Sequence, residues 1–100
     1  MEKRTAHYDL DAVKAVVMSI RLAAFTSTAR QGARRMGLNE SETLSVVMGL
    51  GRSMFFKSMT THADHRIWQD VYRAPCPNGK TAYIKLTLQD GAVIIQFKEK

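Results

Sequence analysis

Cysteine, proline and long apolar runs are all scarce in this chain of 100 residues. The one cysteine, Cys76, cannot form a disulfide within the chain, so nothing requires an oxidising compartment. No apolar stretch approaches the ~18–20 residues that a membrane-spanning helix needs. The start of the chain, Met1-Glu2-Lys3-Arg4, lacks the apolar core of a signal peptide. We therefore expect a cytoplasmic protein.

Acidic residues are also few. Nine Asp and Glu stand against fifteen Lys and Arg, which gives a net charge of +6 and a pI near 9.8. This balance favours a polyanionic partner such as nucleic acid, although a solvated basic surface would give the same composition. The length predicts one domain, residues 1–100, with a modest hydrophobic core.

Three short helices are predicted in the first half of the chain, because apolar residues recur there at helical spacing after good capping residues. The expected segments are about 10–19 after Asp9, about 27–36 after Thr26, and a third from Asn39 to Gly49. Glu42 stands three residues after Asn39, which is typical of a capping box. The short segment Ile20–Phe25 is predicted to be an edge strand or an extended linker.

Four strands follow in the second half. The segments Phe55–Thr60 and Trp68–Arg73 flank a polar turn, and two more strands flank Asp90-Gly91. Helices first and a meander of strands afterwards predict an α+β fold, with the three helices on one face of a mostly antiparallel four-stranded sheet.

The dipeptide Asp90-Gly91 fixes the register of the last two strands. It is a strong signal for a two-residue turn, most simply of type I′. Counting outward from the turn pairs three apolar residues with three others, on what we expect to be the buried face. The opposite face then pairs Tyr83 with Lys98. Pro75 and Pro77 interrupt the preceding connection, so the partner of Tyr83 on the Trp68–Arg73 strand cannot be counted.

Polar residues at strand centres break the expected pattern and suggest function. Lys57 and Gln69 are the clearest cases. By alternation, Met59 shares a face with Lys57, whereas Trp68 and Tyr72 point the other way and are expected to pack against the helices. Asp70 is expected on the same face of the strand as these aromatic residues. A carboxylate at that position would need a cation from one of the helices as its partner.

Metal and nucleophile sites have weak support. His62 and His65 would need Asp64 and Cys76 to complete a zinc site, and that spacing matches no ordinary closed site. No base is in view to activate Cys76 as a nucleophile. No glycine-rich phosphate loop is present. We expect no metal and no cofactor.

Several runs closely resemble the MqsR toxin family. They are Lys57–Thr61 (KSMTT), Asp64-His65, Ile67–Arg73 (IWQDVYR) and the two ends, Met1–Thr5 and Phe97–Lys100. The resemblance implies a RelE-like fold and a small ribonuclease toxin that cuts free mRNA at GCU-like triplets without needing the ribosome. It also implies an MqsA-like antitoxin as partner, with a zinc-binding N-terminal domain and a helix-turn-helix C-terminal domain.

The family's active-site residues match this chain at Lys57, Gln69, Tyr83 and Lys98. RNA can be cut without metal, because its 2′-hydroxyl serves as nucleophile and the protein supplies a base, an acid and positive donors. Lys57 would stabilise charge or act as base, Tyr83 would move a proton or orient the hydroxyl, Lys98 would neutralise phosphate, and Gln69 would position the RNA. We expect RNA to be bound also by Met59, Arg73, Lys85, Arg30 and Arg34.

A second hypothesis remains. The segment Ser27–Leu50 resembles a helix-turn-helix, with Arg30, Arg34 and Arg35 placed to contact phosphates. The protein would then be a nucleic-acid-binding regulator without enzymatic activity.

Overall fold

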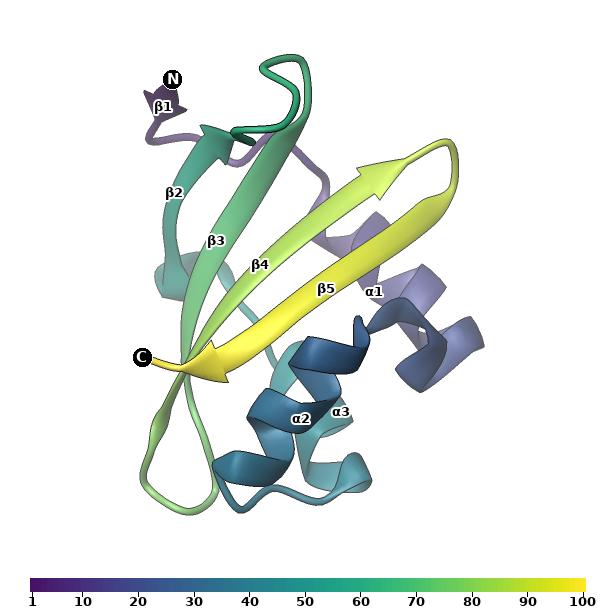
Figure 1. The fold of residues 1–100 in the computed structure, drawn as a ribbon, viewed down its shortest axis with the longest axis vertical. Coiled ribbons are helices and arrows are strands. Elements are labelled where there is room, and N and C mark those ends of the chain that lie inside the picture. Colours follow the sequence, from purple (N-terminus) through teal and green to yellow (C-terminus); the bar gives the residue numbers. More distant parts are fainter.

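The computed structural model describes residues 1–100, with three α-helices on one face of a five-stranded antiparallel sheet (Figure 1). The helices are α1 (Leu10–Ile20), α2 (Ser27–Arg35) and α3 (Glu40–Met48), with short 3₁₀ helices at Arg21–Ala24 and Arg52–Met54. The strands lie in sequence order: β1 (Glu2–Lys3), β2 (Phe55–Thr60), β3 (Trp68–Pro75), β4 (Thr81–Gln89) and β5 (Ala92–Glu99). The α+β class is confirmed. No helix has the length and hydrophobicity to span a membrane.

The sheet has one strand more than predicted. Strand β1 consists of two residues, Glu2 and Lys3, which pair with Met59 and Ser58 on the outer edge of β2. Two residues are too few to show an alternating pattern, so the local sequence carries no signal for this strand.

The sequence predicts an edge strand or an extended linker at Ile20–Phe25, and this prediction is wrong. Arg21 ends α1 with a positive φ of 54°, and the chain then forms a tight 3₁₀ helix that buries Ala24. Only Phe25 is extended, where it forms an isolated parallel bridge with Ile95 of β5. Ala24 is therefore buried by a 3₁₀ helix and not by a strand.

The predicted helix starts are confirmed by their caps. Thr26 Oγ1 accepts a hydrogen bond from the Ala29 amide at 3.0 Å. Asn39 and Glu42 form the reciprocal capping box, with contacts of 2.8 and 2.9 Å. Such caps satisfy amides that a helix leaves without internal partners.

The β4–β5 hairpin has the predicted register, with Gln89 paired to Ala92 and Tyr83 paired to Lys98. Asp90 and Gly91 both have positive φ, 51° and 76°, as a type I′ turn requires. Side chains of β4 and β5 that face the helices, such as Ile84, are fully buried in the core.

Helix α2 lies unusually close to β5. A Cβ atom on Gly32 would stand 2.3 Å from the carbonyl oxygen of Phe97. Just before the helix, the Thr26 amide donates to the Ile95 carbonyl at 3.1 Å. Two contacts therefore fix α2 against the edge of the sheet.

The N-terminal segment explains the placement of Asp70 and Trp68. The fully buried Asp70 carboxylate accepts hydrogen bonds from the amides of His7 and Tyr8 at 2.9–3.0 Å, not from a helix cation. Trp68 does not pack on the helices as predicted; it stacks on His7, with ring centroids 5.5 Å apart. Tyr72 does lie in the core, where burial raises its pKa to about 12.

Candidate active site

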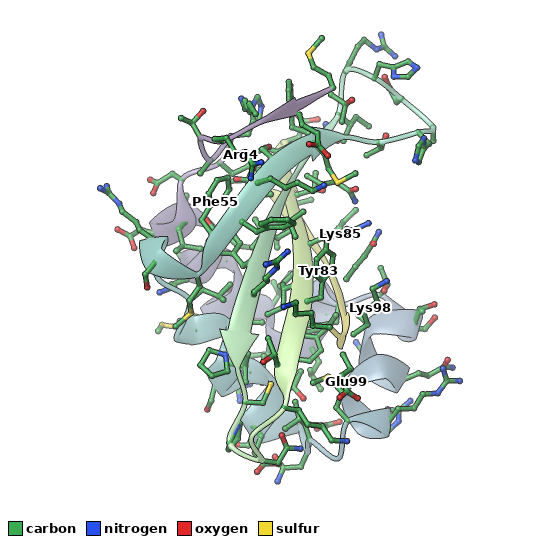
Figure 2. The ribbon with its side chains drawn as sticks, turned by 90° about the vertical axis from the view of Figure 1, so that its left-hand side faces the viewer. Arg4, Phe55, Tyr83, Lys85, Lys98 and Glu99 are labelled. Atoms are coloured by element: carbon green, nitrogen blue, oxygen red, sulfur yellow. The ribbon has the colours of Figure 1, made fainter.

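Two rows of facing residues cross the sheet on the side turned away from the helices. Strand pairing places Lys57, Val71, Lys85 and Gln96 in one row, and Arg73, Tyr83 and Lys98 in the next. Figure 2 shows Tyr83, Lys85 and Lys98 together on this open face. Neighbouring strands are ~4.8 Å apart, so long side chains within a row can meet one ligand. Four positively charged residues of the predicted site therefore share one surface: Lys57, Arg73, Lys85 and Lys98.

Tyr83 is flanked by two cations. The Lys98 ammonium nitrogen lies 5.6 Å from the centroid of the Tyr83 ring. On the other side, Arg73 is the residue of β3 that faces Tyr83, a pairing that the sequence could not supply. The phenol therefore sits in a strongly positive setting that favours anionic ligands.

A β-bulge in β2 adds a residue that sequence analysis missed. Regular alternation would put Phe55 and Lys57 on one face, but the ladder shifts by one residue between them. Phe55 packs edge-on against Tyr72 on the core side, whereas the Phe56 ring lies 3.5 Å from the guanidinium carbon of Arg73. Two consecutive aromatic residues in an alternating strand were the signal for this bulge.

Arg73 has an unused hydrogen-bond donor. Its Nε atom is buried and has no partner in the protein. Leaving a buried donor unpaired costs ~1–3 kcal/mol. The Phe56 ring packs on the guanidinium plane by a cation–π contact and helps to fix the position of this side chain. The chemistry of this group fits a phosphate oxygen, which guanidinium groups bind well.

Lys57 is engaged by a carboxylate from the N-terminal strand. Its Nζ atom donates to Glu2 Oε1 at 2.6 Å. This hydrogen bond first, and the attraction between the charges second, hold the pKa of Glu2 below its usual 4.5. The Glu2 side chain is 55% exposed, so an incoming anion can displace it from Lys57.

Stability should depend on pH differently in the variant Glu2→Gln. The lowered pKa means that the pair stabilises the folded state above about pH 4.5 and that this contribution is lost as pH falls through the lower, folded-state value. The melting temperature of the variant should lie slightly below that of the unmodified protein at pH 7, and the two should converge at an acidic pH below the lowered pKa of Glu2. An equal difference at both pH values would show that the ion pair does not contribute.

Gln69 and Met59 lie at a different end of the open face. They pair with each other across β2 and β3. Gln69 is four residues along β3 from Arg73, a separation of ~13 Å at strand spacing. The structure therefore brings Lys57, Arg73, Tyr83, Lys85 and Lys98 onto one central surface, and places Gln69 and Met59 beside it.

Arg30 and Arg34 are not part of this surface. They border a cavity of about 220 Å³ between α2 and the start of α3. Arg30 Nη2 donates to the Leu22 carbonyl at 2.6 Å, so this arginine helps to hold the chain that enters α2. The contacts give Arg30 a structural role.

Asp64 and Cys76, which a zinc site would need, are an ion-pair partner and a buried thiol. Asp64 binds the Arg66 guanidinium at 3.0 Å, and this hydrogen bond lowers the pKa of Asp64. Cys76 is buried, and burial raises the pKa of its thiol. No three His, Cys, Asp or Glu side chains are grouped in a way that could hold a metal ion.

Comparisons with known proteins identify the family of this chain. Residues 5–99 match the family model described as "Motility quorum-sensing regulator, toxin of MqsA". The chain is 43% identical over 100 residues to the mRNA interferase toxin MqsR of Escherichia coli strain K12, and the alignment covers the whole of both chains. The chain belongs to the MqsR toxin family.

Proposed function

We propose that this protein is the toxin of a toxin–antitoxin pair and that it acts as an endoribonuclease on mRNA. The relative from Escherichia coli is named an mRNA interferase toxin, and it matches over its entire length. The single observation that carries the proposal is the row Arg73–Tyr83–Lys98, which sets a phenol between two cations on the open face of the sheet. Residues 1–100 would act as one RelE-like ribonuclease domain.

The proposed reaction uses the 2′-hydroxyl of RNA as nucleophile. Its oxygen attacks the adjacent phosphorus, the bond from phosphorus to the 5′-oxygen breaks, and a 2′,3′-cyclic phosphate forms. One group removes the proton of the 2′-hydroxyl and another protonates the departing 5′-oxygen. Lys57, Tyr83 and Lys98 are the candidates for these proton transfers, and cations among them also stabilise the negative charge of the transition state.

The contacts of Lys57 and Arg73 favour charge stabilisation for both. The Lys57 ammonium donates to the Glu2 carboxylate, which is the kind of contact that an anionic phosphate oxygen would also accept. A phosphate would take the place of Glu2 on Lys57 and accept a bond from the Arg73 guanidinium. Gln69 is better placed to contact a nucleotide farther along the RNA than to meet the scissile phosphate.

The alternative, a helix-turn-helix regulator, receives little support. Such a motif inserts the N-terminal end of its second helix into the major groove. Here that end of α3 carries Glu40 and Glu42, and the helix contains no lysine or arginine. Four of its residues are buried, so no basic face is available to DNA.

The partner proposed for this toxin is an antitoxin resembling MqsA. The matching family is described as the toxin of MqsA, which is the basis for this proposal. We propose that the antitoxin has a zinc-binding N-terminal domain and a helix-turn-helix C-terminal domain, and that cleavage by the free toxin prefers GCU-like triplets.

Incubation of the purified protein with a defined RNA in EDTA tests the proposed function. We expect cleavage at an undiminished rate, 5′ fragments that end in a 2′,3′-cyclic phosphate or its 3′-phosphate product, and cuts clustered at GCU-like triplets. RNA that shifts in a gel but stays intact would favour the regulator. A requirement for added Mg²⁺ or Zn²⁺ would contradict the proposed mechanism.

A further inference from the structure

A cavity of about 360 Å³ opens beside the Tyr83–Lys98 pair, between the start of α2 and strands β4 and β5. Its wall on the sheet includes Tyr83, Lys85, Gln96 and Lys98, and its opposite wall includes Thr28. The volume lies at the lower end of the range for small-ligand sites, ~300–1,000 Å³, so it suits one nucleotide unit. The cavity thus continues the candidate active site toward the edge of the sheet.

The cavity is preformed by the contacts of α2. The helix is tied to β5 by the bond from the Thr26 amide to the Ile95 carbonyl and by the close approach of Gly32 to Phe97. Because Gly32 already touches the β5 backbone, the helix cannot move inward to close the space. A ligand therefore does not have to open this site before it binds, which lowers the cost of binding.

The chemistry of the lining matches a nucleotide. Two lysines, Lys85 and Lys98, and no carboxylate line the cavity, which favours a phosphate at the end near Tyr83. Toward the sheet edge, Gln96 is exposed, and its amide makes no hydrogen bond within the protein. A carboxamide offers one acceptor and two donors in a plane, the pattern that pairs with a base edge.

We propose that this cavity binds the base of a nucleotide adjacent to the scissile phosphate and that Gln96 reads the edge of that base. The inference rests on the proposed ribonuclease function and deepens it, because it assigns a residue to sequence preference. Gln96 stands in the same cross-strand row as Lys57 and Lys85. A base held at its end of the row lies next to the cations proposed to hold the phosphate.

The test compares Gln96→Ala with the unmodified protein on a short RNA that holds one preferred cleavage site. Loss of a bidentate base contact worth ~1–3 kcal/mol corresponds to about a 5- to 150-fold fall in kcat/KM. A matched series of RNAs carries an abasic nucleotide at each position around the cut. At one position the two proteins should cleave the abasic RNA equally well, because the contact is already absent. Gln89→Ala is the control, since Gln89 lies on the same sheet outside the cavity.

Affinity for an RNA with a 2′-deoxy nucleotide at the cleavage position is measured alongside. An equal fall in kcat/KM on every RNA of the series, or no fall at all, would overturn the inference while leaving the ribonuclease proposal intact. If the unmodified protein bound the 2′-deoxy RNA but cut none of the all-ribose RNAs of the series, the ribonuclease proposal would fail. The inference for Gln96 would then stand only if Gln96→Ala weakened binding of every RNA except the one that is abasic at a single position. Absence of RNA binding would overturn both.

Discussion

Replacing Lys57 by alanine should reduce the rate of RNA cleavage by about 10²–10³-fold, the usual cost of removing one preorganised donor to a transition-state charge. Lys57 lies on the open face of β2 and contributes nothing to the hydrophobic core. The free energy of unfolding should therefore change little beyond the loss of the ion pair with Glu2, and the melting temperature should fall only slightly. The measurements are kcat/KM on a defined RNA and the melting temperature of the same preparation.

Lys80→Ala is the matched control for this experiment. It removes the same charge, but Lys80 is exposed in the loop between β3 and β4 and makes only a long contact of 3.9 Å with Glu99. Cleavage by this variant should stay close to normal, with a small effect of net charge. If Lys80→Ala lost as much activity as Lys57→Ala, the effect would be one of overall charge and the assignment of Lys57 would be wrong.

Gly32→Ala should strongly destabilise the fold. In an ordinary helix this change stabilises by ~0.5–1 kcal/mol. Here the added Cβ would stand 2.3 Å from the Phe97 carbonyl oxygen, so α2 must move away from β5. We expect a loss of about 3 kcal/mol or more, the upper end for overpacking, and hence a melting temperature lower by roughly 10–25 °C.

Gly51→Ala provides the comparison for this stability prediction. A Cβ on Gly51 would meet no atom within 4 Å, and its φ of −132° suits any residue. Its melting temperature should change little. A Gly32→Ala protein as stable as the Gly51→Ala protein would mean that α2 can shift at low cost, and the preformed cavity beside it would then be in doubt.

Local signals were sufficient to predict the elements whose contacts are close in sequence. The caps at Asn39 and Thr26 predicted where α3 and α2 begin, because each involves residues only three apart. The turn at Asp90-Gly91 predicted the whole β4–β5 ladder, including the pairing of Tyr83 with Lys98. A two-residue turn allows only one register, so the partner of each residue follows from counting outward from the turn.

Contacts between distant parts of the chain could not be predicted. Glu2 reaches Lys57 across 55 residues, and Asp70 binds amides 62 and 63 residues away. Neither pairing has any local pattern, because each depends on where β1 and the N-terminal segment come to rest. The position of Arg73 beside Tyr83 could not be counted either, because the five-residue connection between their strands obeys no fixed turn rule. Pro75 was expected to interrupt the ladder, but it ends β3 and pairs with Thr81.

The β-bulge at Phe56 has a consequence for how this family can change by insertion and deletion. Loss of one residue from a strand normally exchanges its two faces. Here Phe55 and Lys57 already pair with the consecutive residues Tyr72 and Val71, so deletion of Phe56 would leave a regular ladder with every other side chain on its present face. Insertion or deletion of a single codon can therefore add or remove the ring that packs on Arg73 without changing the fold. The position of the Arg73 guanidinium in the candidate active site can thus change in evolution while the sheet stays the same.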